Sequence, residues 1–171
     1  MVKIGRNVFI ADTAVIIGDV TIGDNVTIMD SCVIRGDQNS IIIGDNTNIQ
    51  DNATVHTSLR DKTIIGRNVS IGHNAIVHGS TVDDLVLVGM GAILMNGSHI
   101  RSGSVIAAGA VVTEGFESPE NALVAGLPAR VIKTDEKYRK MAEENSREYL
   151  ILNKRHLNHE FDVVKGKTCR D

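Results

Sequence analysis

Aliphatic residues recur at every sixth position through most of the chain. The positions are Ile10, Ile16, Ile22, Ile28, Ile34, Ile43, Ile49, Val55, Ile65, Ile71, Val77, Val82, Val88, Leu94, Ile100, Ile106 and Val112. A fixed period indicates stacked copies of one small unit that share a core. β-Hairpins would also explain the β-branched residues, but their turns would come at longer and irregular spacing. The sequence therefore predicts a β-solenoid.

The residues around this pattern agree with a narrow, crowded solenoid. Glycine often follows the aliphatic residue, as at Gly23, Gly44, Gly66, Gly72 and Gly89, where the backbone must turn with little steric room. The chain has no tryptophan, two tyrosines and three phenylalanines, so β-branched side chains must fill the core. Such hexapeptide repeats resemble the left-handed parallel β-helix, in which three hexads form one triangular coil.

The six-residue pattern ends at Val112, and the composition changes after it. Residues 114–130 contain both prolines and are expected to form a loop that closes the solenoid. From about residue 135 to 152, apolar residues recur at helical spacing and predict one amphipathic helix: Tyr138, Met141, Ala142, Tyr149 and Leu152. We therefore expect a β-helix domain at 1–133, a helix packed along it at 134–156 and a tail at 157–171.

Two histidines fall into one column when the sides of the triangle are numbered in turn from Ile10. The second side then carries a stack of residues from successive coils, in the order Arg35, His56, His78 and Met95. Neighbouring parallel strands are about 4.8 Å apart. His56 and His78 can therefore bind one zinc ion, whose bonds to histidine nitrogen are about 2.0–2.1 Å long.

A third histidine, His73, falls on a different side. It lies on the first side above Asp51, with Gln50 beside that column. One side of the triangle spans nearly 20 Å, so His73 is not expected to reach the metal of its own chain. In a closed three-fold ring, one chain's first side faces the next chain's second side. We therefore expect a homotrimer with metal sites at its interfaces.

The pattern is interrupted three times, and each interruption follows the second side. Residues are gained between Ile34 and Ile43 and between Val55 and Ile65, and one is lost between Val77 and Val82. Loops on a rigid scaffold often shape functional sites. We expect these loops to form a pocket beside the histidine column.

Composition and charge argue against secretion, membrane insertion and nucleic-acid binding. Cys32 and Cys169 lie far apart without the spacing of a redox or metal motif, and residues 1–12 lack the features of a signal peptide, which favours the cytoplasm. No apolar stretch reaches the roughly 18–20 residues needed to cross a membrane. A net charge of -3 from mixed charges offers no basic face for nucleic acid.

Several motifs together resemble the γ-class carbonic anhydrases and their bacterial relatives. They are Arg35-Gly36-Asp37, Asn48-Ile49-Gln50-Asp51-Asn52, His56, Ile71-Gly72-His73, His78-Gly79, Val88-Gly89-Met90-Gly91-Ala92 and Gly126-Leu127-Pro128-Ala129-Arg130. The resemblance covers nearly the whole chain. It implies a left-handed β-helix with a C-terminal helix and a metal-dependent, reversible hydration of carbon dioxide to bicarbonate.

The resemblance also implies roles for individual residues. The metal ligands would be His56 and His78 of one subunit and His73 of the next. Gln50 would orient the metal-bound hydroxide, and a charged network across the interface would contain Arg35, Asp37 and Asp51. Three imidazoles leave a position on Zn²⁺ for water, whose pKa the metal lowers to about 7. Fe²⁺ and Co²⁺ suit the same ligands.

Other interpretations remain open. Gln38 and Leu59 stand where the archaeal enzymes of this family have glutamates, so turnover is expected to be slow. A hexapeptide acyltransferase, a thioesterase and a metal-binding scaffold are the alternatives. His99, His156 and His159 are interpreted as structural residues, and Cys32, Met90 and Met95 as packing residues.

Overall fold

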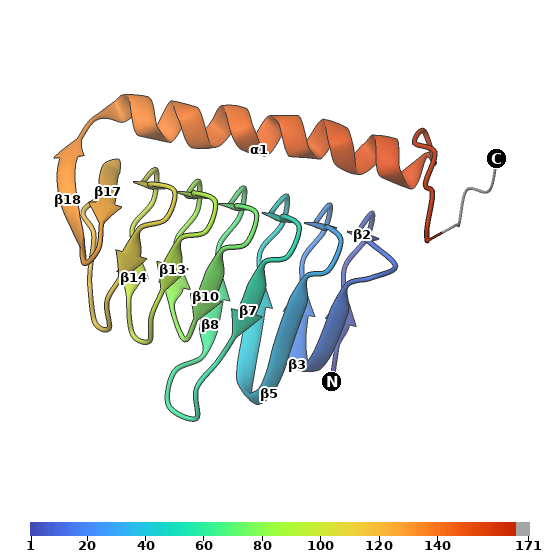
Figure 1. The fold of residues 1–171 in the computed structure, drawn as a ribbon, viewed down its shortest axis with the longest axis horizontal. Coiled ribbons are helices and arrows are strands. Elements are labelled where there is room, and N and C mark those ends of the chain that lie inside the picture. Colours follow the sequence, from blue (N-terminus) through green and yellow to red (C-terminus); the bar gives the residue numbers. More distant parts are fainter. Residues whose placement is uncertain (167–171) are drawn as a thin grey trace.

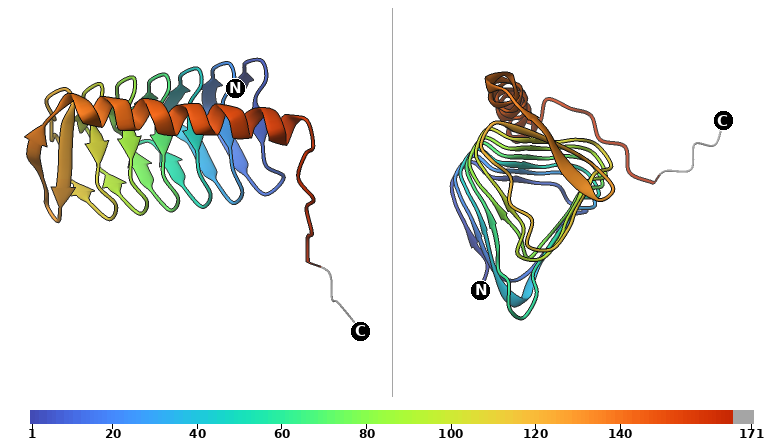
Figure 2. Two further views of the ribbon diagram at one scale, coloured as in Figure 1. Left: turned by 90° about the horizontal axis from the view of Figure 1, so that it is seen from above. Right: turned by 90° about the vertical axis from the view of Figure 1, so that its left-hand side faces the viewer.

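The computed structural model describes residues 1–166, and the last residues of the predicted tail lie outside this range. The chain winds into a triangular prism of parallel strands, with one helix lying along its length (Figure 1). An end-on view shows the three sides of the prism (Figure 2). This is the predicted left-handed β-helix of hexapeptide repeats with a C-terminal helix.

The first side is an eight-stranded sheet. Its strands are β2 (Phe9–Ile10), β4 (Thr27–Ile28), β6 (Asn48–Ile49), β9 (Ser70–Ile71), β12 (Leu87–Val88), β15 (Val105–Ile106), β17 (Ala122–Gly126) and β18 (Ala129–Thr134). All neighbouring pairs are parallel except β17 and β18, which are antiparallel. Strand β18 therefore ends the repeating part of the fold.

The second and third sides form one ten-stranded sheet, because β3 (Val15–Ile22) and β5 (Val33–Ile43) continue around the edge between them. The remaining strands of the second side are β7 (Thr54–His56), β10 (Ile76–His78), β13 (Ile93–Leu94) and β16 (Val111–Val112). Those of the third side are β1 (Lys3–Ile4), β8 (Thr63–Ile65), β11 (Thr81–Val82) and β14 (His99–Ile100).

The aliphatic residues of the hexad pattern form the core. On the first side the fully buried stack consists of Ile28, Ile49, Ile71, Val88, Ile106 and Val124. The glycines are explained by the close approach of successive coils: a Cβ on Gly44 would lie 2.6 Å from the carbonyl carbon of Gly66. The left-handed backbone conformation falls two residues later, on asparagine, as at Asn46 with φ 62°.

The expected loop at 114–130 is wrong in part. Residues 122–126 form β17, which stacks on β15 as one further coil, with Val124 opposite Ile106. Pro119 precedes β17 and Pro128 lies in the turn before β18, so neither proline interrupts a ladder. The solenoid therefore continues beyond the point where the hexad pattern ends.

Helix α1 (Glu136–Leu157) contacts strands of the first side along the whole prism. Figure 2 shows it running over the coils from the C-terminal to the N-terminal end. Asp135 caps the helix by accepting a hydrogen bond from the backbone N–H of Lys137. No helix among the described residues is long and apolar enough to cross a membrane.

The predicted buried face of the helix is partly wrong. Tyr138 and Ala142 are buried as expected, but Met141 is 45% exposed. The stripe continues instead through Ser146 and Asn153. Asn153 donates from Nδ2 to the carbonyl oxygen of Val26 and to the Thr27 hydroxyl, at 3.0 Å each. Asn153 can replace an apolar residue because the surface beneath it offers these two acceptors. The Ser146 hydroxyl is also buried, but it has no hydrogen-bond partner among the described residues.

Candidate metal centre

His56 and His78 lie side by side on the second side of the prism. They end strands β7 and β10, and the ladder places them directly opposite each other. Nδ1 of His56 is 3.0 Å from Nε2 of His78. The next coil on the other side places Arg35 opposite His56. The stacking predicted from the hexad pattern is therefore present.

Asp37 holds the outer nitrogen of His56. Its Oδ1 lies 3.2 Å from His56 Nε2, and its Oδ2 accepts a 2.6 Å hydrogen bond from Nη1 of Arg35. The Arg35 hydrogen bond lowers the pKa of Asp37, with a smaller effect in the same direction from His56. The carboxylate is thus ionised and available as an acceptor for the imidazole.

His73 lies elsewhere, just after β9 on the first side. Its Nδ1 is 2.9 Å from Oδ2 of Asp51, and its side chain is 39% exposed. Within residues 1–166, no group of three metal-binding side chains comes together. The chain thus brings His56 and His78 together but not His73. Within the chain Asp51 contacts His73, and the network of Arg35 and Asp51 across an interface stays a prediction. Metal binding by the three histidines stays a prediction.

Gln50 is held beside the His73 column by a short chain of buried polar groups. Its Nε2 donates to Oδ1 of Asn48 at 3.0 Å, and Asn48 donates to the Ser70 hydroxyl at 2.8 Å. Because Asn48 uses its amino group on Ser70, its oxygen is free to orient Gln50. Asn48 is part of a family motif in the sequence, but its role in orienting Gln50 is visible only from the contact between the two side chains.

A cavity of about 380 Å³ borders Gln50 and His73. Apolar residues of β12 and β15 form much of its wall, and Asn145 and Tyr149 of helix α1 close another side. Burial is the main cause that raises the pKa of Tyr149, and the charge of Asp51 adds to it. The tyrosine is therefore a neutral phenol near the His73–Asp51 pair.

Two further residues support the histidine pair and were not predicted. Asn96 Oδ1 lies 2.6 Å from Nδ1 of His78. The buried Thr63 donates its hydroxyl to the carbonyl oxygen of His56 and accepts from the N–H of Gly79 at 3.0 Å. Their position in the sequence could have indicated this role, because both residues fall at the edge of the prism where the hexad pattern is interrupted.

Two methionines interpreted as packing residues lie at the surface instead. Met90 is 59% exposed and Met95 is 37% exposed. Met90 borders the cavity beside His73, and Met95 borders a second cavity beside His78. Cys32 is fully buried, as expected.

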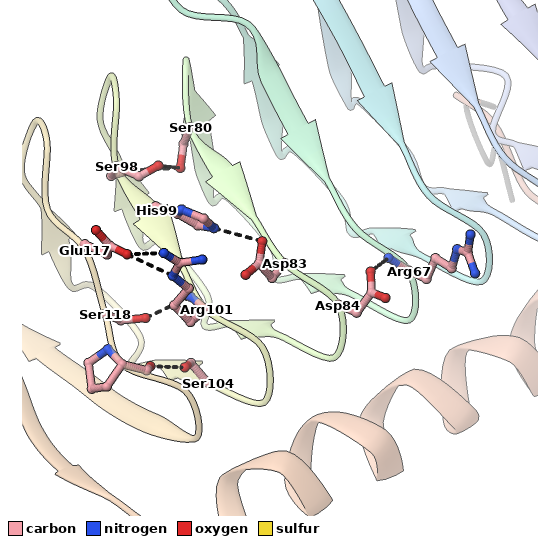
Figure 3. A network of polar contacts seen from close by, with 11 residues as sticks. Arg67, Ser80, Asp83, Asp84, Ser98, His99, Arg101, Ser104, Glu117 and Ser118 are labelled. Atoms are coloured by element: carbon pink, nitrogen blue, oxygen red, sulfur yellow. Dashed lines mark hydrogen bonds and ion pairs between the residues drawn. The ribbon is translucent and has the colours of Figure 1, made fainter.

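Two of the remaining histidines, His99 and His156, have side-chain contacts away from the site. His99 lies on the third side, where Nε2 is 2.8 Å from Oδ1 of Asp83. Figure 3 shows this pair within a larger polar network, in which Arg101 binds Glu117 and the Ser118 hydroxyl. His156 stacks on Phe9 with ring centroids 4.4 Å apart.

The histidine pair fits a metal ion. Two nitrogens bound to a tetrahedral zinc at 2.0–2.1 Å lie about 3.3 Å apart, close to the 3.0 Å between His56 Nδ1 and His78 Nε2. Each predicted ligand also has its other ring nitrogen on a side-chain oxygen: Asp37 for His56, Asp51 for His73 and Asn96 for His78. This arrangement is typical of metal-binding histidines.

Comparison with known proteins identifies the family. A sequence model described as "Bacterial transferase hexapeptide (six repeats)" matches residues 1–36, and one described as "Hexapeptide repeat of succinyl-transferase" matches residues 62–96 and 86–114. A "Probable carbonic anhydrase" of Methanocaldococcus jannaschii is 48% identical over 151 residues, covering 87% of this chain and 94% of that protein. "Gamma carbonic anhydrase 1, mitochondrial" of Arabidopsis thaliana is 43% identical, covering 78% of this chain and 51% of that protein. The chain belongs to the γ-class carbonic anhydrase family.

A solved structure extends this comparison to the fold. A hexapeptide transferase family protein from Anaplasma phagocytophilum superimposes with a TM-score of 0.77 and 36% identity, covering 90% of this chain and 96% of that one. The similar proteins thus include both carbonic anhydrases and a transferase family protein. Family membership explains the architecture of this γ-class protein, and the choice of chemistry depends on its site.

Proposed function

We propose that this protein catalyses the reversible hydration of carbon dioxide to bicarbonate at metal sites between the subunits of a homotrimer. Each site would contain His56 and His78 of one chain and His73 of a neighbour. The observation that carries this proposal is the pair of facing ring nitrogens 3.0 Å apart, combined with His73 held by Asp51 on another side of the prism. The names of the relatives support the same chemistry.

The surface around the histidine pair supports a second copy of the chain as the missing partner. Val15 and Ile17 are 46% and 43% exposed on the same side of the prism. Ile76, Ile93 and Met95 border the cavity beside His78. Exposed apolar surface next to a site commonly marks an interface. A three-fold ring would cover this surface and bring His73 of the next chain toward it.

The histidines would hold the metal, which supplies hydroxide near neutral pH by lowering the pKa of a water ligand. Asp37 and Asp51 keep the imidazoles of His56 and His73 oriented. Gln50 can accept a hydrogen bond at Oε1 from the attacking water, because Asn48 engages its Nε2. Hydration also releases one proton, which must leave through neighbouring side chains or solvent.

The remaining roles follow from charge. Arg35 keeps Asp37 ionised, and in the trimer it would join a network with Asp51 of a neighbouring chain.

We propose Zn²⁺ as the metal, while Fe²⁺ and Co²⁺ suit three imidazoles equally well. A cytoplasmic location also remains a prediction.

The test combines metal analysis with kinetics. Protein purified without oxygen should contain about one metal ion per chain and should hydrate carbon dioxide in a stopped-flow assay. His73→Ala should remove both the metal and the activity, whereas the matched control His99→Ala should keep both. Wild-type protein with no metal and no His73-dependent rate would overturn the proposal.

An acyl transfer reaction is the second candidate, because the family models and the Anaplasma structure carry transferase descriptions. Turnover of acetyl-coenzyme A that survives His73→Ala would favour it. The thioesterase alternative instead predicts His73-dependent hydrolysis of a thioester. A metal-loaded trimer without any turnover would favour a scaffold.

A further inference from the structure

Asn96 makes the shortest of the three side-chain contacts that hold the predicted metal ligands. Its Oδ1 is 2.6 Å from His78 Nδ1. An amide oxygen can only accept a hydrogen bond, so the proton in this contact belongs to the imidazole. His78 then carries its proton on Nδ1, and its Nε2 presents a lone pair toward His56 Nδ1.

The chain builds this contact through an interruption of the hexad pattern. One residue is missing between Val77 and Val82, and Gly79 in this short turn has φ 55°. A Cβ on Gly79 would lie 2.5 Å from Asn96 Oδ1. The absence of a side chain at Gly79 therefore opens the space through which the Asn96 side chain reaches His78.

The backbone around Asn96 is fixed by the neighbouring coils. Gly97 donates its N–H to the Gly79 carbonyl at 2.7 Å, and Gly115 donates to the Asn96 carbonyl at 3.0 Å. Asn96 also directly follows Met95, which borders the cavity beside His78. The backbone of Asn96 is thus held in place one coil away from His78, the histidine that its side chain contacts.

We infer that Asn96 is a positioning residue that fixes His78 in the tautomer and orientation needed for metal binding. The inference rests on the proposed function, since it assigns a task at the same site. Asp37 and Asp51 hold their histidines with carboxylates, whereas Asn96 does so with a neutral group. The loss of such a partner typically weakens metal binding by about 10- to 100-fold.

The first test needs no metal. Long-range ¹⁵N–¹H NMR of metal-free wild-type protein, at mildly alkaline pH where imidazoles are neutral, reports which nitrogen of each histidine carries the proton. The His78 signal is assigned by its loss in His78→Gln. We expect the Nδ1–H tautomer for His78. The Nε2–H tautomer would overturn the inference, whether or not any variant of Asn96 folds.

The second test measures zinc affinity by competition with a chromogenic chelator. Asn96→Ala should bind zinc about 10- to 100-fold more weakly, whereas Asn96→Asp, which keeps the acceptor oxygen, should bind at least as tightly as wild type. Asn46→Ala is the matched control, because it removes asparagine hydrogen bonds at another edge of the prism.

The outcomes separate this inference from the proposed function. Wild-type protein that fails to bind zinc contradicts the metal site itself. Zinc binding by wild type with equal affinity in Asn96→Ala contradicts the role of Asn96 alone. Equal weakening in Asn96→Ala and Asn96→Asp would also contradict it, because Asp keeps the acceptor oxygen and that oxygen would then not be what holds His78.

Discussion

At the scale of single residues, the site depends on which atoms of each side chain are already engaged. Sequence reasoning placed His56 beside His78, because strand register follows from a strict six-residue period. It could not find Asn96, whose contact depends on a side-chain conformation and on the short turn at Gly79. The period also placed His73 above Asp51, and the structure adds the 2.9 Å contact between His73 Nδ1 and Asp51 Oδ2.

Cys32 offers a residue-scale test of the packing beneath Gln50. Its thiol is fully buried and donates a 3.0 Å hydrogen bond to the Gln50 carbonyl. Burial raises the pKa of Cys32 from 9.0 to about 11. The native thiol therefore keeps its proton in a pH range where the unfolded chain loses it. Its contribution to stability is fully present below the unfolded pKa and is lost as pH rises through the folded pKa.

We expect the free energy of unfolding of a Cys169→Ser protein to fall between about pH 8 and about pH 10.5, by about 1–2 kcal/mol more than that of Cys32→Ala/Cys169→Ser. Chemical denaturation at the two pH values measures this difference. Since the two proteins differ only at position 32, all other titrating groups cancel. An identical pH dependence in both would contradict the burial of a protonated thiol.

At the scale of elements, the strands were easier to predict than the helix surface. Each aliphatic residue of the hexad pattern packs into the same core, so the strands could be predicted from many equivalent positions. The buried stripe of helix α1 instead includes Ser146 and Asn153, which a hydrophobic pattern assigns to the solvent-exposed face. Strand β17 was missed for a related reason: the prolines near it suggested a loop, although both lie outside the strand. Local signals fail where neighbouring elements supply the hydrogen-bond partners.

Asn153 should therefore matter more for stability than Met141, although Met141 is the more hydrophobic. Asn153→Ala leaves the Val26 carbonyl and the Thr27 hydroxyl without their helix donor and should lower the free energy of unfolding by about 1–3 kcal/mol. Met141→Ala, at an exposed position, should change it by less than about 0.5 kcal/mol. Urea denaturation compares the two variants, and a larger loss in Met141→Ala would show that the helix packs by a different face.

At the scale of the whole molecule, one chain contains all three histidines but not a complete site. The two sheets of the prism keep His73 away from His56 and His78. Under the proposed function, assembly and metal binding would therefore be one requirement. The solenoid could be predicted from the sequence because the six-residue period is repeated many times along the chain. The trimer depends on a contact between chains, and for this reason it remains a proposal.

Complementation between two inactive variants tests the shared site most directly. His73→Ala keeps the histidine pair, and His78→Ala keeps His73. If equal amounts are refolded together, about three quarters of the trimers are mixed, and each mixed trimer regains one complete site of its three. Carbon dioxide hydration should recover to about a quarter of the wild-type rate, while the double variant His73→Ala/His78→Ala mixed with either single variant should stay inactive. Failure of the two single variants to restore any activity, although they form mixed trimers, would contradict a site shared between chains.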